Sequence, residues 1–285
     1  MRLTNWGLVY ITGGSSGIGY AIASRVLQEN GSVVLFARNR HRLEQAAERL
    51  SASFSAERIS VIVMDVTSYE SIQGAVDEAV TSRGAPDMLV NCAGMAHPDH
   101  FFHLSYDIFA QTIETNLLGT AAVTKLVLPH MSAGSHLVMI SSIAGFLGTY
   151  GYTAYSASKF GIMGFSQALR NELRPEGISV SVLCPPDTDT PQLVEENKTK
   201  PPETFAISGN AKLMSSLQVA KAFAKGVKKG QFLIIPGTSG KMIFLLNQLV
   251  PGLVRTIMDG IVRKARKQEG LTRRFVFEKG DQAPE

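Results

Sequence analysis

Tyr155 and Lys159 stand four residues apart in a segment that reads as the start of a helix, and these two residue types can perform acid–base chemistry. At that spacing two side chains share one face of a helix, so we expect the phenol and the ammonium to be neighbours. The positive charge is expected to lower the pKa of Tyr155 from its ordinary value of about 10. A tyrosine tuned in this way gives a proton to a carbonyl oxygen or takes one from an alcohol. Because Tyr-x-x-x-Lys arises by chance on many helices, its meaning depends on the rest of the chain.

A glycine-rich run joins an expected strand, residues 7–12, to an expected helix, residues 17–30. Gly13 allows a tight turn, Gly17 lets the backbone approach a pyrophosphate, and Gly19 lets the helix pack closely on the sheet. The free N–H groups and the positive dipole end of the helix favour phosphate. This context predicts a dinucleotide site that includes Gly13, Ser15, Ser16, Gly17, Ile18 and Gly19.

The end of the second expected strand indicates which dinucleotide is bound. Sites for NAD usually place Asp or Glu there, whereas sites for NADP accept Arg beside the 2′-phosphate. Here the strand ends in Ala37-Arg38, without an acid. A guanidinium can pair with the phosphate and stack on adenine. We therefore expect NADPH/NADP⁺ as the cofactor, bound by Arg38 with help from Ser15 and Arg40, and we expect no metal site.

The elements that must position these residues alternate along the chain. Apolar runs predict strands at residues 7–12, 32–37, 59–64, 88–91, 136–141, 178–183 and 232–235. Helical patterns lie between them, at residues 17–30, 40–53, 68–83, 105–131, 153–174 and 218–229. This alternation predicts βαβ units, and strands that are apolar throughout predict a parallel sheet covered on both faces. The fold class is therefore α/β.

Composition narrows the protein class. With 285 residues, of which 45% are hydrophobic and 18% charged, the chain is globular and not disordered. Its two cysteines, Cys92 and Cys184, lie in apolar strand-like runs, which excludes a disulfide framework and fits a reducing compartment. The N-terminus shows no signal-peptide pattern, so we expect a cytoplasmic protein.

Together these segments resemble the short-chain dehydrogenase/reductase family from about residue 8 to residue 236. The resemblance implies a Rossmann-type, doubly wound parallel sheet of about seven strands and a reaction that interconverts C=O and CH–OH. It implies four catalytic residues: Asn116, Ser142, Tyr155 and Lys159. In this reading Ser142 holds the carbonyl, Tyr155 is the acid, Lys159 tunes the tyrosine, and Asn116 supports a proton-relay water.

Neighbouring residues offer alternatives for two of these roles. Ser141 precedes Ser142, and the family spacing of thirteen positions before Tyr155 favours Ser142. Tyr150 and Tyr152 also precede the helix, but only Tyr155 has a lysine four residues later. The resemblance also implies further cofactor contacts, some of them shared with the catalytic residues: Asp65, Val66, Asn91, Ala93, Gly94, Tyr155, Lys159, Pro185, Asp187, Thr188 and Thr190.

The segment after the sixth strand carries a narrower resemblance. The family commonly has Pro-Gly there, whereas this chain has Pro185-Pro186, and the second proline stiffens the loop. Residues 185–191, 195–204 and 91–96 resemble the 3-ketodihydrosphingosine reductases, a branch of the family. This resemblance implies reduction of the 3-keto group of 3-ketodihydrosphingosine to dihydrosphingosine by NADPH. The substrate carries an amine near the ketone, and four acids of the segment could meet it: Asp187, Asp189, Glu195 and Glu196.

The C-terminal part predicts a separate extension. We expect a reductase domain at residues 1–236, including a substrate loop at 185–215, and an apolar then basic extension at 237–285. Apolar residues recur at helical spacing from Leu246 to Ile261, while polar residues and Pro251 argue against a spanning helix. Basic residues follow, at Arg263, Lys264, Arg266, Lys267, Arg273 and Arg274. Such a helix lies on an anionic membrane surface, covers the site, or packs on its own domain.

Other functions remain open at this point. One alternative is a reductase of the same fold that acts on another carbonyl, such as a 3-oxoacyl thioester or a steroid. A second is an NADP-binding scaffold without activity, although all four implied catalytic residues are present. The partners expected are a long-chain keto-amine lipid, a second copy in a homodimer, and a membrane surface contacted peripherally, but no nucleic acid.

Overall fold

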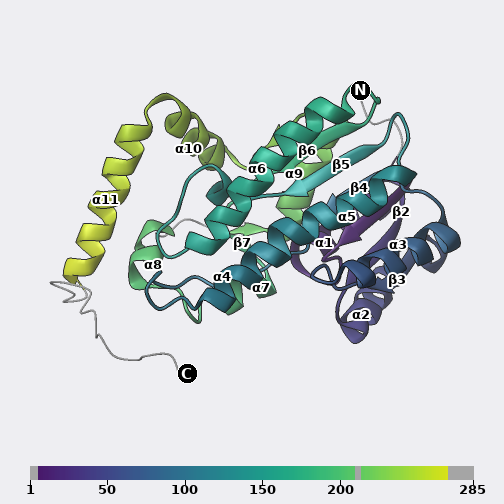
Figure 1. The fold of residues 1–285 in the computed structure, drawn as a ribbon, viewed down its shortest axis with the longest axis horizontal. Coiled ribbons are helices and arrows are strands. Elements are labelled where there is room, and N and C mark those ends of the chain that lie inside the picture. Colours follow the sequence, from purple (N-terminus) through teal and green to yellow (C-terminus); the bar gives the residue numbers. More distant parts are fainter. Residues whose placement is uncertain (1–5, 209–212, 269–285) are drawn as a thin grey trace, which may run out of the picture.

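A computed structural model describes residues 6–208 and 213–268, and seven parallel strands form its central sheet (Figure 1). The strands run in the order β3-β2-β1-β4-β5-β6-β9. Their bounds are β1 Leu8–Thr12, β2 Ser32–Ala37, β3 Ile59–Val63, β4 Met88–Asn91, β5 His136–Ile140, β6 Ser179–Leu183 and β9 Leu233–Ile234. The order reverses beside β1, because β2 and β4 pair on opposite sides of it. The predicted Rossmann-type α/β sheet of about seven strands is confirmed.

Helices cover both faces of the sheet. One face carries α1 (Gly17–Gln28), α2 (Arg40–Ser51) and α9 (Ser216–Lys228), whose buried residues join one core cluster. The other face carries α3 (Tyr69–Arg83), α5 (Gly119–Val127) and α6 (Thr153–Leu173). Polar side chains start several of these helices: Ser68 accepts from the backbone N–H of Ser71, and Ser215 forms a capping box with Gln218.

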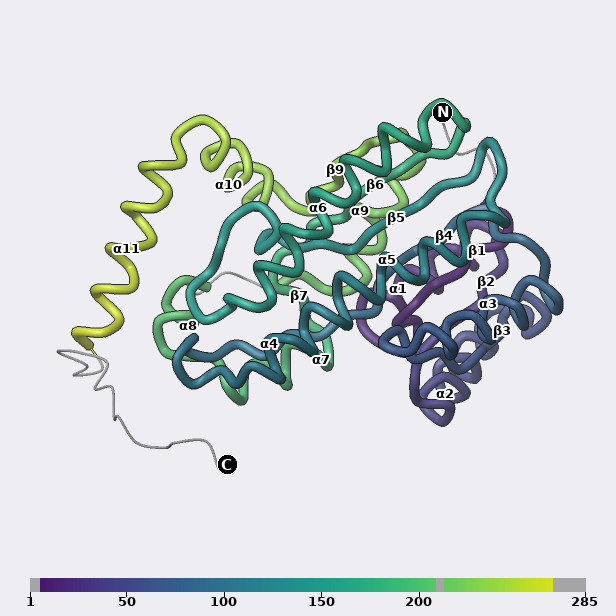
Figure 2. The backbone as a smooth tube through the Cα atoms, in the orientation of Figure 1, coloured from purple at the N-terminus to yellow at the C-terminus, as the bar shows by residue number. Residues whose placement is uncertain are grey.

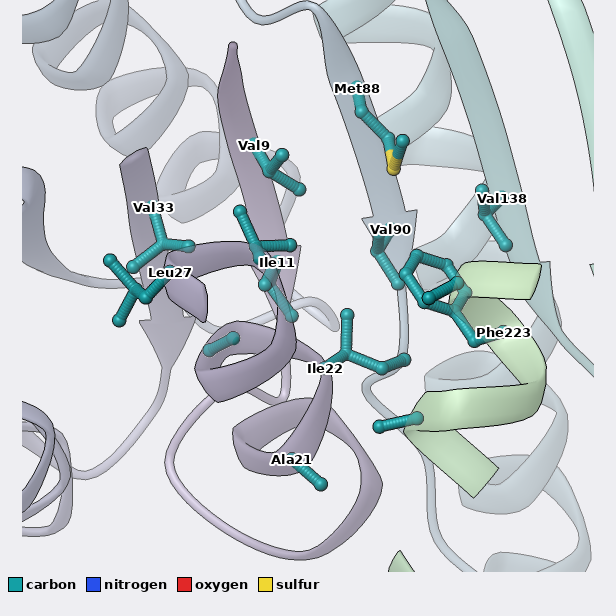
Figure 3. Close-up of a cluster of buried hydrophobic side chains, with 14 of the residues drawn as sticks. Val9, Ile11, Ala21, Ile22, Leu27, Val33, Met88, Val90, Val138 and Phe223 are labelled. Carbon is teal, nitrogen blue, oxygen red and sulfur yellow. The ribbon is translucent and has the colours of Figure 1, made fainter. Parts of the chain in front are cut away.

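The alternation of side chains along each strand divides the core in two. Val9 and Ile11 of β1 point toward α1, where Ile22 meets them, and Phe223 of α9 packs beside Val90 of β4 (Figure 3). Tyr10, between Val9 and Ile11 in sequence, belongs to the opposite cluster. Because both faces are buried, every strand residue of β1 from Val9 to Thr12 is buried, and this explains the unbroken apolar run in the sequence.

The long helical stretch predicted at residues 105–131 is not one α-helix. It consists of α4 (Tyr106–Ile113), a π-helical turn η2 (Glu114–Leu118), α5, and a 3₁₀ turn η3 (Leu128–His130) that contains a proline. The π-helical turn widens the helix where Asn116 lies, a form often found at functional sites. The hydrophobic pattern predicts the helix but not this local change in winding.

The predicted loop-rich segment after β6 contains short elements. They are β7 (Thr188–Asp189), α7 (Pro191–Glu196), α8 (Pro202–Ser208) and β8 (Met214–Ser215), and β7 pairs with β8 outside the main sheet. Residues 209–212 of the predicted loop lie outside the described part. Thr190 starts α7 by accepting from the backbone N–H of Leu193, and Pro191 fits the first helical turn.

The C-terminal segment forms two helices rather than one. α10 (Thr238–Leu249) ends before Val250, and α11 (Pro251–Gln268) follows and runs along the outside of the molecule (Figure 2). Val250 has φ −136° because a residue before proline is driven out of helical geometry, so the helix expected to continue through it breaks there. In the described residues no helix is long and apolar enough to cross a membrane. Arg273 and Arg274 of the basic tail lie beyond the described residues.

Candidate active site

The four predicted catalytic residues come from three segments that meet at the carboxyl edge of the sheet. Ser142 follows β5 and starts the 3₁₀ turn η4 (Ile143–Gly145), Asn116 lies in η2, and Tyr155 and Lys159 lie in the first turns of α6. α6 contacts both η4 and η2 closely. Residues that are distant in sequence are therefore brought together at the point where parallel strands end, the usual place for a site in this fold class.

The Ser142 side chain interacts with the hydroxyl of Tyr155 and works to lower the pKa of this phenol. Ser142 Oγ also accepts from the backbone N–H of Ala144 at 3.1 Å, which fixes its direction. Its neighbour Ser141 is turned away, because its Oγ donates to the backbone oxygen of Lys159 at 3.0 Å. The geometry therefore distinguishes the two serines: a carbonyl oxygen could be held jointly by Ser142 and Tyr155, whereas Ser141 fastens α6 to the sheet.

The pKa of Tyr155 is raised, not lowered as the Tyr–Lys spacing suggests. Burial is the main cause, and the carboxylates of Glu196 and Asp187 add to it, while the hydrogen bond with Ser142 works in the other direction. Lys159 Nζ lies 5.4 Å from the centre of the tyrosine ring and donates to the backbone oxygen of Ile140 at 3.0 Å. The expectation of a lowered pKa is wrong because burial, the largest cause, raises it. Tyr155 is held as a protonated phenol, the form of a proton donor.

Lys159 is itself strongly affected by its surroundings. The side chain is buried, and burial lowers its pKa from 10.5 to about 8. A lysine with this pKa changes its charge close to neutral pH, so it can pass a proton on as well as hold a charge. Its hydrogen bond to the backbone oxygen of Ile140 keeps the Nζ atom at the carboxyl end of β5, near the ring of Tyr155.

Asn116 joins the loop after β4 to the catalytic helix. Its Nδ2 donates to Met95 O and to Ser158 Oγ, both at 2.9 Å, and its Oδ1 accepts from the backbone N–H of Met95 at 2.8 Å. Ser158 Oγ in turn donates to Tyr155 O at 2.7 Å. A Cβ on Gly94 would lie 3.2 Å from Asn116 Oδ1 and 3.6 Å from Lys159 Nζ. Asn116 therefore positions the site through its side chain, and glycine at 94 keeps the space between the two residues open.

The predicted phosphate loop has backbone that only glycine adopts easily. Gly13 and Gly17 have φ of +65° and +54°. A Cβ on Gly13 would lie 2.9 Å from the backbone nitrogen of Ala93, and one on Gly19 would lie 2.4 Å from Gly13 O. Thr12 Oγ1 accepts from Cys92 N and Ala93 N at 3.0 Å each, which ties the ends of β1 and β4 together. This closely packed turn at a helix N-terminus fits a pyrophosphate.

Arg38 and Asp65 lie together at the ends of β2 and β3. Burial works to raise the pKa of Asp65, but hydrogen bonds from the backbone and hydroxyl of Thr67 and the charge of Arg38 outweigh it and lower this pKa. Arg38 is exposed, whereas Arg40 lies toward Glu44 at 4.0 Å. The end of β2 itself carries Arg38 and no acid, which fits a 2′-phosphate better than a 2′-hydroxyl.

Other predicted cofactor contacts differ in where they lie. A Cβ on Gly17 would be 3.2 Å from Thr190 Cγ2, so the start of α7 lies over the glycine loop. The Asn91 side chain instead points into the interior, where Nδ2 donates to Thr124 Oγ1 at 2.9 Å, so only its backbone is left to face the site. The remaining predicted contacts follow strand ends along the same edge: Ser15, Ser16, Ile18, Val66, Ala93, Gly94, Pro185, Asp187 and Thr188.

Two buried carboxylates complete the site. Glu196 accepts from Tyr152 OH at 2.6 Å, and Glu203 accepts from Tyr150 OH at 3.2 Å. The sequence suggests the two tyrosines only as alternative acids, suggests Glu196 only as one of four acids, and gives no signal for Glu203. Their partners come from distant segments, which no sequence pattern reveals.

The sequence is similar to a described family and to curated proteins of several organisms. The sequence profile of a family described as short chain dehydrogenase matches residues 7–201. The 3-dehydrosphinganine reductase of Danio rerio is 38% identical over 260 residues, which cover 89% of this chain and 77% of that protein. The 3-ketodihydrosphingosine reductase of Dictyostelium discoideum is 35% identical over 263 residues, 86% of this chain and 78% of that protein.

Solved structures agree with the fold. A dehydrogenase/reductase from Sinorhizobium meliloti 1021 has a TM-score of 0.71 and 25% identity, covering 81% of this chain and 94% of that one. A single-substitution variant of the actinorhodin polyketide ketoreductase with NADPH has a TM-score of 0.70 and 27% identity, with coverage of 82% and 97%. A short chain dehydrogenase/reductase from Burkholderia phymatum in complex with NAD, at 22% identity and a TM-score of 0.74, supports the fold alone; it covers 96% of this chain and 98% of that one.

Proposed function

This chain belongs to the short chain dehydrogenase family of oxidoreductases, and we propose that it reduces the 3-keto group of 3-ketodihydrosphingosine to dihydrosphingosine with NADPH. The observation that carries the substrate is the identity of 35–38% over most of the chain to relatives named for this ketone. The observation that supports reduction of the ketone is that Tyr155 is held protonated beside Ser142. Both the geometry and the similarity thus favour a ketoreductase.

The chain's own residues account for the proton side of the reaction. Ser142 Oγ and Tyr155 OH donate to the substrate's carbonyl oxygen, which fixes the carbonyl and draws electron density toward oxygen. Tyr155 then transfers its proton to that oxygen as negative charge develops there. Lys159, whose pKa burial lowers to about 8, replaces the proton from solvent. Asn116 holds the loop after β4 and the start of α6 together during this transfer.

The residues present fit a nicotinamide dinucleotide. The glycine loop and the N-terminus of α1 would hold its pyrophosphate, Asp65 its adenine, and Arg38 a 2′-phosphate. When bound, the reduced nicotinamide supplies a hydride to the carbonyl carbon.

The Arg38→Ala variant tests the choice of NADPH: we expect its preference for NADPH over NADH to fall at least about tenfold, since a charge-assisted hydrogen bond contributes about 1.5–3 kcal/mol. Arg42 is also exposed and lies on α2, so the Arg42→Ala variant is the control and should keep the preference for NADPH. An unchanged ratio in Arg38→Ala would exclude this role.

The proposed reaction is tested by NADPH oxidation with purified protein and 3-ketodihydrosphingosine in detergent. An acetoacetyl thioester serves as the competing ketone, and Tyr155→Phe is the control for background oxidation. We expect turnover of the sphingoid ketone and its loss in the variant. Turnover of only the thioester would keep the mechanism but replace the substrate, whereas NADPH binding without turnover of either would favour another ketone or a scaffold.

We further propose that the start of the C-terminal extension contacts an anionic membrane surface from one side. Large apolar side chains on α10 and α11 are exposed, with Leu249 at 69% and Leu253 at 55%. The same helices carry the basic residues Lys241, Arg255, Arg263, Lys264 and Lys267. Exposed apolar area beside positive charge is typical of helices that lie on anionic lipid, and a long-chain substrate would be drawn from such a surface.

Vesicle sedimentation tests this contact. The double variant Leu249→Gln/Leu253→Gln should lose most of its binding to phosphatidylserine-containing vesicles, while Leu217→Gln, an exposed leucine on α9, should bind as the parent does. Equal sedimentation of all three proteins would assign the exposed leucines to another contact.

A homodimer is the assembly that we propose. Phe160 on α6 and Leu118 on η2 are 46% and 58% exposed, and these elements contact each other, so they offer an apolar surface for a second copy. Analytical ultracentrifugation of the parent and of Phe160→Ser should show a dimer that the variant weakens. A monomeric parent protein would contradict the proposal.

A further inference from the structure

The segment after β6 carries four acids, and the structure separates one of them from the rest. Asp187 and Asp189 are exposed, and Glu195 is exposed and paired with Lys198 at 2.5 Å. Glu196, at the end of α7, is only 8% exposed. The exposed acids are solvated or already paired, so Glu196 is the acid whose charge needs an explanation.

The carboxylate of Glu196 is met by neutral donors. Tyr152 OH donates to Oε2 at 2.6 Å, and Gln192 Nε2 donates to Oε1 at 2.8 Å. Across residues 6–208 and 213–268, no Lys, Arg or His nitrogen forms an ion pair with it within 4.0 Å. Lys200 is nearby, but its Nζ lies over the rings of Tyr152 and Phe205, at 5.8 and 5.3 Å from their centres. A buried carboxylate without a cation is unfavourable, which favours binding of a cation at this position.

Glu196 is also close to the reacting centre. The ring of Tyr152, which holds it, lies 5.6 Å from the ring of Tyr155. After burial, the charge of Glu196 is the largest cause that raises the pKa of Tyr155. The same charge raises the pKa of Lys159, which burial lowers. The negative charge of Glu196 therefore affects the pKa of both Tyr155 and Lys159, the two residues that handle the proton.

We propose that Glu196 binds the ammonium group of the substrate and so selects long-chain 2-amino ketones over ketones that lack the amine. The inference rests on the proposed function for the identity of the ketone. In such a substrate the amine-bearing carbon is bonded directly to the carbonyl carbon, so a carbonyl held by Ser142 and Tyr155 carries its ammonium beside the tyrosine. Glu196 is linked to this position through Tyr152, whose hydroxyl donates to the carboxylate and whose ring lies 5.6 Å from the ring of Tyr155.

This arrangement links recognition to chemistry. The negative charge of Glu196 makes Tyr155 a weaker acid while no cation is bound. A bound ammonium offsets that charge and lowers the pKa of Tyr155 toward its ordinary value. Tyr155 therefore becomes a stronger acid when the amine-bearing ketone is in place. We expect Glu196 to affect kcat as well as KM for this ketone, whereas a residue that only shaped the loop would affect both ketones alike.

The test compares Glu196→Gln with the parent protein and with Glu195→Gln, the exposed neighbour. Turnover of 3-ketodihydrosphingosine is measured beside the same long-chain ketone without the amine. Binding of dihydrosphingosine and of the matching amine-free 1,3-diol is measured by calorimetry in the same detergent. We expect kcat/KM and binding of the amine compounds to fall about 10- to 100-fold in Glu196→Gln, the range for a charge-assisted hydrogen bond. Turnover of the amine-free ketone should not fall in Glu196→Gln and should rise if anything, because the charge that weakens Tyr155 as an acid is gone. Binding of the diol, and all four measurements in Glu195→Gln, should be nearly unchanged.

The outcomes separate this inference from the proposed function. An equal loss for amine and amine-free compounds, or no loss for either, would overturn the role of Glu196. If the parent turns over neither ketone, but Glu196→Gln still binds dihydrosphingosine more weakly and the diol equally, the amine site stands and the proposed reaction fails. Thermal unfolding of each variant shows whether the fold is intact, and Gln keeps the size of the side chain and an acceptor for Tyr152.

Discussion

The carboxyl edge of the sheet and the helices α7, α8 and α11, here called the cover, are held by different kinds of contact. At the edge, the side chains of Ser142, Asn116 and Lys159 form hydrogen bonds with backbone groups, Ser142 within its own turn and the other two with separate segments. In the cover, α8 and α11 meet through side chains around one buried acid, Glu203. A hydrogen bond between a side chain and a backbone group depends on the residue type at one position only. A contact between two side chains depends on the residue types at both positions. The difference suggests that the edge fixes the chemistry and the cover sets the substrate.

Glu203 shows how the cover is assembled. Its side chain is 1% exposed and is approached by Tyr150 OH at 3.2 Å, Arg266 Nε at 3.7 Å and His100 Nε2 at 3.8 Å. These partners come from the loop before α6, from α11 and from the loop after β4. Thr204, the next residue, also donates to Tyr150 O at 2.8 Å. One acid thus connects the C-terminal helix to the segment that leads into the catalytic helix.

The largest expected effect is at the edge. Tyr155→Phe removes the proposed proton donor and leaves the ring in place, so kcat should fall about 10²- to 10⁴-fold, the usual contribution of a general acid. NADPH binding, followed by its fluorescence, should remain within about twofold because only one hydroxyl is lost and the phosphate loop is unchanged. A variant that keeps a tenth of the parent kcat would show that another group donates the proton.

Lys159→Met should lose activity and gain stability, which no residue of the cover is expected to do. The folded pKa of Lys159, about 8, lies below its ordinary value of 10.5, so burying the charged form costs at most about 3 kcal/mol of unfolding free energy. That cost is fully present below pH 8 and disappears as the pH rises toward 10.5. We therefore expect the variant to be more stable than the parent by about 1–3 kcal/mol at about pH 7, with the gap closing by about pH 10.5. Urea unfolding at both pH values measures it, and a gap independent of pH would contradict the assignment.

Glu203→Ala should affect stability and substrate binding more than chemistry. Removing the acid leaves Tyr150 OH and Arg266 without this partner, at a cost of about 1–3 kcal/mol. We expect faster hydrogen exchange in α8 and α11, a several-fold higher KM and a kcat within about threefold of the parent. Glu195→Ala, at an exposed acid of the same segment, is the control. Unchanged exchange in α11 would mean that Glu203 does not hold this helix.

The smallest effect is expected from Arg266→Met. Arg266 is one-third exposed and its Nε lies 3.7 Å from Glu203, so solvent screens the pair and the loss should stay below about 1 kcal/mol. The effect should shrink further in high salt. A loss as large as that of Glu203→Ala would show that the pair is as well shielded as the acid itself, and would reduce the contrast between edge and cover.

The sequence predicts the edge better than the cover because the edge depends on local patterns. Apolar runs predict the strands, and the glycine spacing predicts the turn that the structure has at Gly13 and Gly17. The π-helical turn at Asn116 and the raised pKa of Tyr155 are not predictable in this way, since both depend on how distant segments pack. The break before Pro251 is visible in the sequence as a proline, but the apolar spacing across it favours one helix.

The cover remains less predictable for a physical reason. Glu203 and Glu196 look like solvated acids in a polar loop, and only three-dimensional packing buries them against Tyr150 and Tyr152. The domain boundary near residue 236 and the roles of individual site residues stay predictions.

A single turnover tests the proposed role of Tyr155, with NADPH that carries deuterium on its transferable position and 3-ketodihydrosphingosine in detergent. The product is analysed by mass spectrometry. We expect dihydrosphingosine with one deuterium on carbon 3 from the parent protein, and unchanged ketone from Tyr155→Phe. Product without deuterium, or equal product from both proteins, would contradict the assignment of this site as a ketoreductase that uses Tyr155 as its acid.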